Sequence, residues 1–186
     1  MNYIISQTIV IINGYFKFEL GKAKTQLRFL FFKLMICLFD IVKYLLLGAF
    51  TGLMSIIVSI IRSSVYYGFK HHKKDVPIFI PILLNIVMII LTSYTYSGWW
   101  SLLPLAGSIT CTWADWQPDL YSSKTGQIIN ESFWLIYKIM YSAWLDMIVT
   151  IIEIASCWHG LKESEPQPKK IVIYKGIRKE ILLNAA

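Results

Sequence analysis

Long apolar runs, broken by a few small or polar residues, alternate with short basic segments along this chain. The clearest run, from Tyr44 to Ile61, carries no charged residue, and as a helix it would span about 27 Å. Residues 76–114 contain no Asp, Glu, Lys, Arg or His. A soluble core does not need such a stretch, whereas two membrane spans do. The pattern therefore predicts a helical membrane protein.

The apolar runs predict an all-α, polytopic membrane bundle of about seven transmembrane helices. Their approximate ranges are residues 3–18, 26–46, 45–69, 76–94, 98–114, 128–140 and 142–158. One long tilted helix is the alternative for the last two. Between the fifth and sixth ranges, residues 115–127 are expected to form a polar connection. Tryptophan pairs flank the fifth range, as expected of residues at the membrane–water interface.

The basic residues follow the apolar runs in a way that predicts orientation. With seven spans and the N-terminus outside, 14 lysines and arginines, Lys17 among them, face the cytoplasm, and only Lys43 lies opposite. This asymmetry fits the positive-inside rule. The net charge of +7 is therefore interpreted as topogenic, and no nucleic-acid partner is expected. The predicted location is the bacterial inner membrane, with a cytoplasmic C-terminus.

Two short resemblances within the chain predict an internal repeat. Lys24-Thr25 is similar to Lys124-Thr125, and the segment 67–70 is similar to 159–162. A parallel repeat needs an odd linker helix to restore its orientation. The predicted organisation is a transmembrane bundle and a basic cytoplasmic tail. The bundle covers residues 1–161, with repeats at 3–69 and 98–160 and a linker helix at 76–94, and the tail covers 162–186.

Small and polar residues form a stripe on one face of each of two predicted helices. The first stripe is Gly48, Gly52, Ser55, Ser59 and Arg62, and the second is Ser142, Asp146, Thr150, Glu153 and Cys157. One interpretation is a polar seam that lines a solute path, with Asn85 as a further contact. The other is ordinary helix packing, for which Gly48 and Gly52 would allow close approach.

Charged residues inside the spans require partners or access to water. Arg62 and Glu153 are expected either to pair across the repeats or to reach the cytoplasmic surface separately. Asp40 is expected to pair with Lys33 or Lys43 along one helix. Asp146 could pair with Lys138 or take up a proton.

Several segments of the chain resemble the YgjV-type family of bacterial inner-membrane proteins. These segments are Tyr44-Leu-Leu-Leu-Gly-Ala-Phe-Thr-Gly52 followed by Arg62, Trp100-Ser-Leu-Leu-Pro104 with Gly107, and Phe133-Trp-Leu-Ile-Tyr137 with Glu153. The resemblance covers about residues 5–161 and implies an inner-membrane location and a helical fold. That family in turn looks like a distant relative of the SWEET and PQ-loop carriers, which implies a three-one-three helix arrangement and small solutes as cargo. Gln117-Pro118 reverses the PQ pair and lies in a predicted loop.

Together these features predict a multi-pass membrane protein that facilitates passage of a small sugar- or metabolite-like solute. The alternative is a membrane structural or assembly protein that packs through the Gly48/Gly52 face. No nucleotide loop or hydrolase motif is present, so an enzyme, a cofactor and a metal are not expected. The expected partners are the lipid bilayer and a small solute, and a second copy of the chain is a further candidate.

Overall fold

The computed structural model describes residues 2–47, 50–140 and 144–164, and these form helices and connecting turns without a strand. The helices are α1 (Asn2–Gly21), α2 (Gln26–Leu47), α3 (Phe50–His71), α4 (Phe79–Tyr94), the 3-10 turn η1 (Trp99–Ser101), α5 (Leu102–Trp116), α6 (Leu120–Met140) and α7 (Trp144–Lys162). The all-α prediction is confirmed. The last two predicted spans are two separate helices. Gly48, Ser142 and most of the predicted tail lie outside the described residues.

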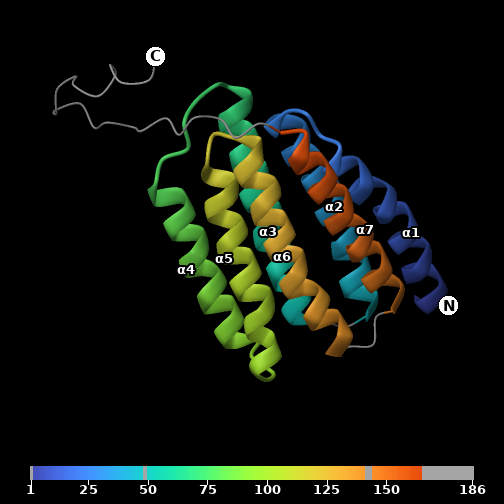
Figure 1. Ribbon diagram of the computed structural model, residues 1–186. Coiled ribbons are helices and arrows are strands. Elements are labelled where there is room, and N and C mark those ends of the chain that lie inside the picture. Colours follow the sequence, from blue (N-terminus) through green and yellow to red (C-terminus); the bar gives the residue numbers. More distant parts are fainter. Residues whose placement is uncertain (1, 48–49, 141–143, 165–186) are drawn as a thin grey trace, which may run out of the picture.

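Successive helices run in opposite directions and pack side by side (Figure 1). The chain also closes on itself, because α1 packs against α7 and α3 packs against α5. The bundle is therefore a flattened ring with two facing rows, α1–α2–α3 and α5–α6–α7. Helix α4 packs against α3 and α5 at one edge. This arrangement decides which charged residues can meet in the middle.

Helix α6 begins eight residues earlier than the apolar pattern predicts, so the predicted polar connection at residues 115–127 is wrong. Asp119 precedes the helix, and its carboxylate accepts a hydrogen bond from the Ser122 backbone N–H at 2.6 Å. That bond satisfies a donor which the first turn would otherwise leave unpaired. Ser123, Lys124 and Gln127 are then buried on the inner side of the helix. A search for apolar runs does not assign such a turn to a helix, because its polar side chains face protein and not lipid.

Much of the outer surface of the bundle is apolar, and many charged side chains are inside. Ile11, Leu83 and Ile148 are each more than half exposed, whereas Lys43 is 1% exposed and Glu153 is fully buried. Among the described helices, residues 52–71 of α3 and all of α7 are long and apolar enough to cross a membrane, and α4 is apolar but shorter. Buried lysines and carboxylates lower the hydropathy of α1, α2 and α6.

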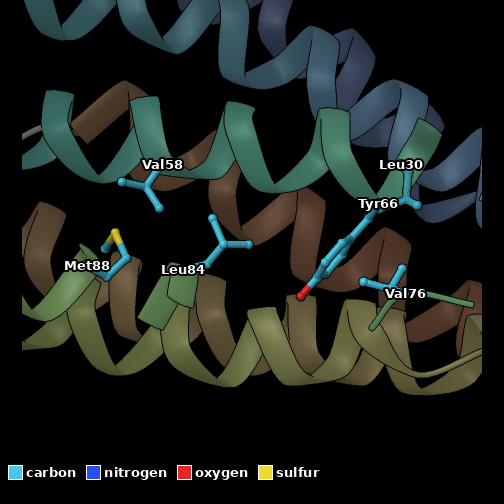
Figure 2. Close-up of a cluster of buried hydrophobic side chains, with 6 residues drawn as sticks. All are labelled: Leu30, Val58, Tyr66, Val76, Leu84 and Met88. Atoms are coloured by element: carbon cyan, nitrogen blue, oxygen red, sulfur yellow. The ribbon is translucent and has the colours of Figure 1, made fainter. Parts of the chain in front are cut away.

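One apolar cluster attaches α4 to the rest of the bundle (Figure 2). Its members come from α2, α3, α4 and the α3–α4 connection: Leu30, Val58, Tyr66, Val76, Leu84 and Met88. The Tyr66 hydroxyl, at the edge of this cluster, donates to the Thr112 carbonyl of α5 at 3.2 Å. The cluster therefore holds α4 in place and links it to the row that contains α5.

Two glycines allow α1 and α7 to approach closely at the end of the bundle where both helices finish. A Cβ atom added at Gly160 would lie 2.1 Å from the Gly21 carbonyl oxygen, and one added at Gly21 would lie 2.4 Å from the backbone of Ser156. Backbone atoms cannot move aside as a flexible side chain can. The α1–α7 contact, which closes the ring, therefore depends on both glycines.

Replacing Gly160 with alanine is expected to reduce the free energy of unfolding by about 1–3 kcal/mol, because the added methyl group forces α1 and α7 apart. Gly68→Ala is the matched control, since a Cβ at Gly68 would meet nothing within 4 Å, and alanine favours helix by up to about 1 kcal/mol. Thermal unfolding of the detergent-solubilised chain measures both variants. Equal melting temperatures for the two variants would contradict the proposed packing.

Candidate functional site

Apart from Lys124, which donates to the Gly160 carbonyl of α7, ten charged side chains of the described residues are buried between the two rows of helices, five of each sign. They are Lys17, Lys33, Lys43, Arg62 and Lys138, and Asp40, Asp115, Glu131, Asp146 and Glu153, all at most 7% exposed. Their formal charges cancel. Because an unpaired buried ion costs several kcal/mol, the pairing among these groups determines whether the bundle can fold. They form three clusters.

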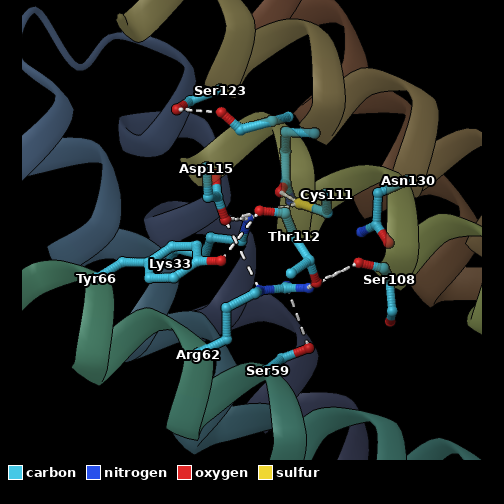
Figure 3. Close-up of polar contacts among 12 residues, drawn as sticks. Lys33, Ser59, Arg62, Tyr66, Ser108, Cys111, Thr112, Asp115, Ser123 and Asn130 are labelled. Atoms are coloured by element: carbon cyan, nitrogen blue, oxygen red, sulfur yellow. Dashed lines mark hydrogen bonds and ion pairs between the residues drawn. The ribbon is translucent and has the colours of Figure 1, made fainter. Parts of the chain in front are cut away.

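The first cluster, called the Asp115 cluster, joins α2, α3 and α5 (Figure 3). The Asp115 carboxylate lies 2.6 Å from Lys33 Nζ and 3.8 Å from Arg62 Nε. Arg62 Nη1 also donates to the Ser108 carbonyl and the Thr112 hydroxyl, each at 3.0 Å. These two acceptors fix the guanidinium on α5. The cluster contains two cations and one carboxylate.

The second cluster, called the Lys17 cluster, joins α1, α6 and α7. Lys17 Nζ lies 2.9 Å from the Glu153 carboxylate and 3.9 Å from that of Glu131. The Gln127 amide donates to both carboxylates, at 2.8 and 3.2 Å, and the Asn130 amide donates to Glu131 at 2.9 Å. The two amides hold the acidic side chains near each other. The cluster contains one cation and two carboxylates.

The third cluster, called the Asp146 cluster, is a balanced group on α2, α6 and α7. Lys43 Nζ lies 2.6 Å from Asp40 and 2.9 Å from Asp146, and Lys138 Nζ lies 3.4 Å from Asp146. The predicted pairs Asp40–Lys43 and Asp146–Lys138 are confirmed. The other partner considered for Asp40, Lys33, belongs to the Asp115 cluster instead.

The predicted Arg62–Glu153 pair is wrong, and so is separate access of these two residues to the surface. Both side chains are buried, and each pairs with another helix, Arg62 with Asp115 and Glu153 with Lys17. The closure of the ring explains this, because α3 packs against α5 and α7 packs against α1. Repeat symmetry alone does not reveal which helices become neighbours.

The residues of the predicted polar seam occupy different parts of the bundle. Ser55, Ser59 and Thr150 are buried, and Thr150 accepts a hydrogen bond from Lys138 at 2.5 Å. Asn85 lies half-buried on α4. A Cβ at Gly52 would lie 3.0 Å from the Tyr44 ring of α2, so this glycine faces α2, the neighbouring helix in the same row.

Sequence reasoning missed Lys17 and Asp115, which are central to two clusters. The charge pattern places Lys17 among the residues that face the cytoplasm, but it lies inside α1 and is 2% exposed. Asp115 was assigned to a polar connection, but it lies in the last turn of α5 and is fully buried. The available signal was their aromatic neighbours: Phe16 and Phe18 flank Lys17, and Trp116 follows Asp115.

A small cavity with a volume of about 40 Å³ lies between the two rows of helices. This volume is enough for about three waters. Helices α1, α2, α3 and α6 supply its lining: Lys17, Lys33, Ile36, Cys37, Asp40, Tyr44, Ile56, Ser59, Arg62, Gln127, Asn130, Glu131, Trp134 and Lys138. Within the described chain, Arg62 Nε and Asn130 Oδ1 are buried without a hydrogen-bond partner. Arg62 Nε lies 3.8 Å from the Asp115 carboxylate, and a Cβ at Gly107 would lie 2.7 Å from Asn130 Oδ1, so two lining residues carry a donor and an acceptor whose hydrogen-bonding capacity is unused.

The chemistry of the cavity is that of a binding site for polar or charged groups. Across residues 2–47, 50–140 and 144–164, no three His, Cys, Asp or Glu side chains are grouped as metal ligands. Lysine, arginine, carboxylate and amide groups provide donors and acceptors beside apolar side chains such as Ile36 and Trp134. Such an arrangement can replace the hydration shell of a small polar molecule.

Comparison with known proteins identifies one family. A family model described as "Imp-YgjV: Bacterial inner membrane protein" matches residues 4–162, which is nearly the whole described chain. Searches of curated proteins and of solved structures found no match. The predicted likeness to the SWEET and PQ-loop carriers has no support in these comparisons and stays a prediction.

Proposed function

The chain belongs to the Imp-YgjV family of bacterial inner membrane proteins, and from this premise we propose that its seven helices all span the membrane and facilitate passage of a small polar solute. The observation that carries the proposal is the polar cavity bordered by three helices of one row and one of the other. A protein that only packs against partners needs no such space at its centre.

The distribution of side chains supports seven spans even for helices of modest hydropathy. Exposed apolar residues cover the outer faces of those helices, for example Ile11 on α1, Leu38 on α2 and Ile136 on α6. The charges that lower their hydropathy point into the bundle, where carboxylates and cations pair. Lipid would therefore meet an apolar surface on every side.

The exposed charges support an N-terminus outside and a C-terminus in the cytoplasm. Lys22 and Lys24 are exposed between α1 and α2, Arg28 is exposed in the first turn of α2, and Lys73 and Lys74 are exposed after α3. The alternating helix directions bring these segments to the same end of the bundle as the end of α7 (Figure 1). By the positive-inside rule that end is cytoplasmic.

The contacts between the rows suit a carrier that opens by relative motion of the two triplets. Ion pairs link the rows: Lys17 with Glu153, Lys33 with Asp115, and Lys43 with Asp146. Such contacts can exchange partners or take up water as the rows separate, which a tightly interlocked apolar core resists. The alternative, assembly through the Gly48/Gly52 face, is weakened because Gly52 faces Tyr44 within the bundle.

The proposal is tested by solute-induced swelling of vesicles that contain the full chain, with glycerol, xylose and glycine as solutes. Ser59→Leu fills part of the cavity lining, and we expect it to reduce the protein-dependent flux at least about 10-fold. Ser64→Leu is the matched control, because Ser64 is exposed on the same helix. Melting temperatures establish that both variants are folded.

Two results would overturn the transport proposal. One is a wild-type flux equal to that of protein-free vesicles for every solute. The other is equal flux in folded Ser59→Leu and wild-type protein, which would place the path elsewhere. A wild-type protein that is inert in vesicles but forms a specific assembly through α3 would favour the structural alternative.

A further inference from the structure

The two rows carry opposite charges at corresponding positions. Lys17 precedes Lys33 by 16 residues, and Asp115 precedes Glu131 by the same distance. Arg62 lies nine residues before the end of α3, and Glu153 lies nine residues before the end of α7. Lysine, lysine and arginine in the first row therefore correspond to aspartate, glutamate and glutamate in the second.

This inversion gives the two clusters opposite net charges. In the Asp115 cluster, Lys33 and Arg62 share one carboxylate, which leaves a formal excess of one positive charge. In the Lys17 cluster, Glu131 and Glu153 share one ammonium group, which leaves an excess of one negative charge. The Asp146 cluster, which completes the ten buried charges, is neutral. These ten charges thus separate into a positive region and a negative region that sum to zero, and Lys124 lies outside the three clusters, on the Gly160 carbonyl.

Both regions line the same cavity. Lys33 and Arg62 of the Asp115 cluster, and Lys17 and Glu131 of the Lys17 cluster, all contribute to its wall. The Nε donor of Arg62, which lies 3.8 Å from Asp115 and has no hydrogen-bond partner, belongs to the positive region. The free Oδ1 acceptor of Asn130 lies beside the negative region, because the amide of the same residue donates to Glu131.

We propose that the cavity binds a small zwitterion, a molecule of amino-acid type with one anionic and one cationic group a few bonds apart. The anionic group would contact Lys33 and Arg62, whose Nε makes no hydrogen bond, and the cationic group would contact Glu131 and Asn130, whose Oδ1 makes none. The proposal rests on the proposed transport function for its biological role and adds the class of solute.

The charge balance explains why a zwitterion fits better than other small molecules. A simple anion compensates the positive region and leaves the negative region unpaired, and a simple cation does the reverse. A neutral polyol provides hydrogen bonds but compensates neither region. A zwitterion compensates both and adds no net charge to a site surrounded by lipid.

Equilibrium binding to the full chain in detergent tests the proposal, with radiolabelled glycine, acetate, methylammonium and glycerol as probes. These are a zwitterion, an anion, a cation and a neutral molecule of similar size. We expect saturable binding of glycine by the wild-type protein, at least about 10-fold tighter than that of any other probe. Glycine should also raise the melting temperature, because a ligand stabilises the state that binds it.

Two single substitutions should redirect the selectivity. Glu131→Gln neutralises the negative region, so acetate should bind at least about 10-fold tighter than glycine. Arg62→Gln neutralises the positive region, so methylammonium should become the preferred probe. Glu19→Gln is the control that should keep the wild-type order, because Glu19 pairs with Lys22 and Arg28 at the edge of the bundle.

The wild-type measurement decides the proposal even if a variant does not fold. The zwitterion proposal is overturned if glycine binds no more tightly than acetate, methylammonium or glycerol. It is also overturned if the order of preference is unchanged in both folded variants.

Failure of the transport proposal would give different results. Glycine binding without flux in vesicles refutes transport and keeps the site, whereas flux of glycerol or xylose without glycine binding keeps transport and refutes the zwitterion.

Discussion

Replacing Asp115 with asparagine is expected to reduce the free energy of unfolding by about 3–5 kcal/mol, the cost typical of leaving a buried ion without its partner. Asp115 is fully buried, and its carboxylate is the counter-ion of both Lys33 and Arg62. The variant would place two uncompensated cations between the rows. The yield of folded protein in the membrane and the melting temperature in detergent measure the effect.

A second substitution separates the loss of charge balance from the loss of a side chain. Adding Lys33→Met to Asp115→Asn returns the buried charges to balance, and we expect it to recover a substantial part of the lost stability. Glu19→Gln is the control, because its ion pairs at the edge of the bundle are worth about 1 kcal/mol or less. A double variant no more stable than Asp115→Asn alone would contradict the assignment of Asp115 as a shared counter-ion.

Replacing Lys17 with methionine is expected to reduce the free energy of unfolding about as much as Asp115→Asn does. The cause is two unpaired negative charges, whereas Asp115→Asn leaves two unpaired positive charges. Methionine retains most of the length of the side chain and removes its charge. Glu153 and Glu131 would then remain buried together without the ammonium group that lies 2.9 and 3.9 Å from them. Like charges in a low-dielectric interior repel each other strongly. The expected loss is about 3–5 kcal/mol, measured as for Asp115.

The compensating change for Lys17→Met is Glu153→Gln, which leaves one carboxylate in the cluster and returns its formal charge to the wild-type value of one negative charge. Measurement of both single variants and of the double variant gives a double-mutant cycle, whose coupling energy reports the Lys17–Glu153 interaction. We expect the double variant to be more stable than Lys17→Met alone. Additive effects, with no coupling, would show that the two side chains do not interact in the membrane.

The sequence predicted the helices better than it predicted the site. The apolar runs located α2, α3 and α4 to within a few residues, and two short-range ion pairs, Asp40–Lys43 and Asp146–Lys138, were correctly anticipated. The start of α6 was missed because its first turns are polar and face protein. A method that reads polarity as exposure to water assigns such residues to loops.

The central members of the site were harder to find. Lys17 and Asp115 lie near helix ends, where charges usually mark the membrane surface, and their aromatic neighbours are a weak local signal that these two are turned inward. The Arg62–Glu153 hypothesis failed for a related reason. It used similar depth in the membrane as the criterion for pairing, whereas pairing also requires that the two helices be neighbours.

The sequence by itself determined that this chain is a bundle of apolar helices for a membrane, because every backbone donor and acceptor in lipid must be satisfied within its own helix. That constraint acts along the chain and leaves a readable pattern. Only the tertiary structure decided which charges meet, because the ring contacts α1–α7 and α3–α5 join residues far apart in sequence. The opposed net charges around the cavity follow from those contacts, since electrostatic energy depends on distance in space.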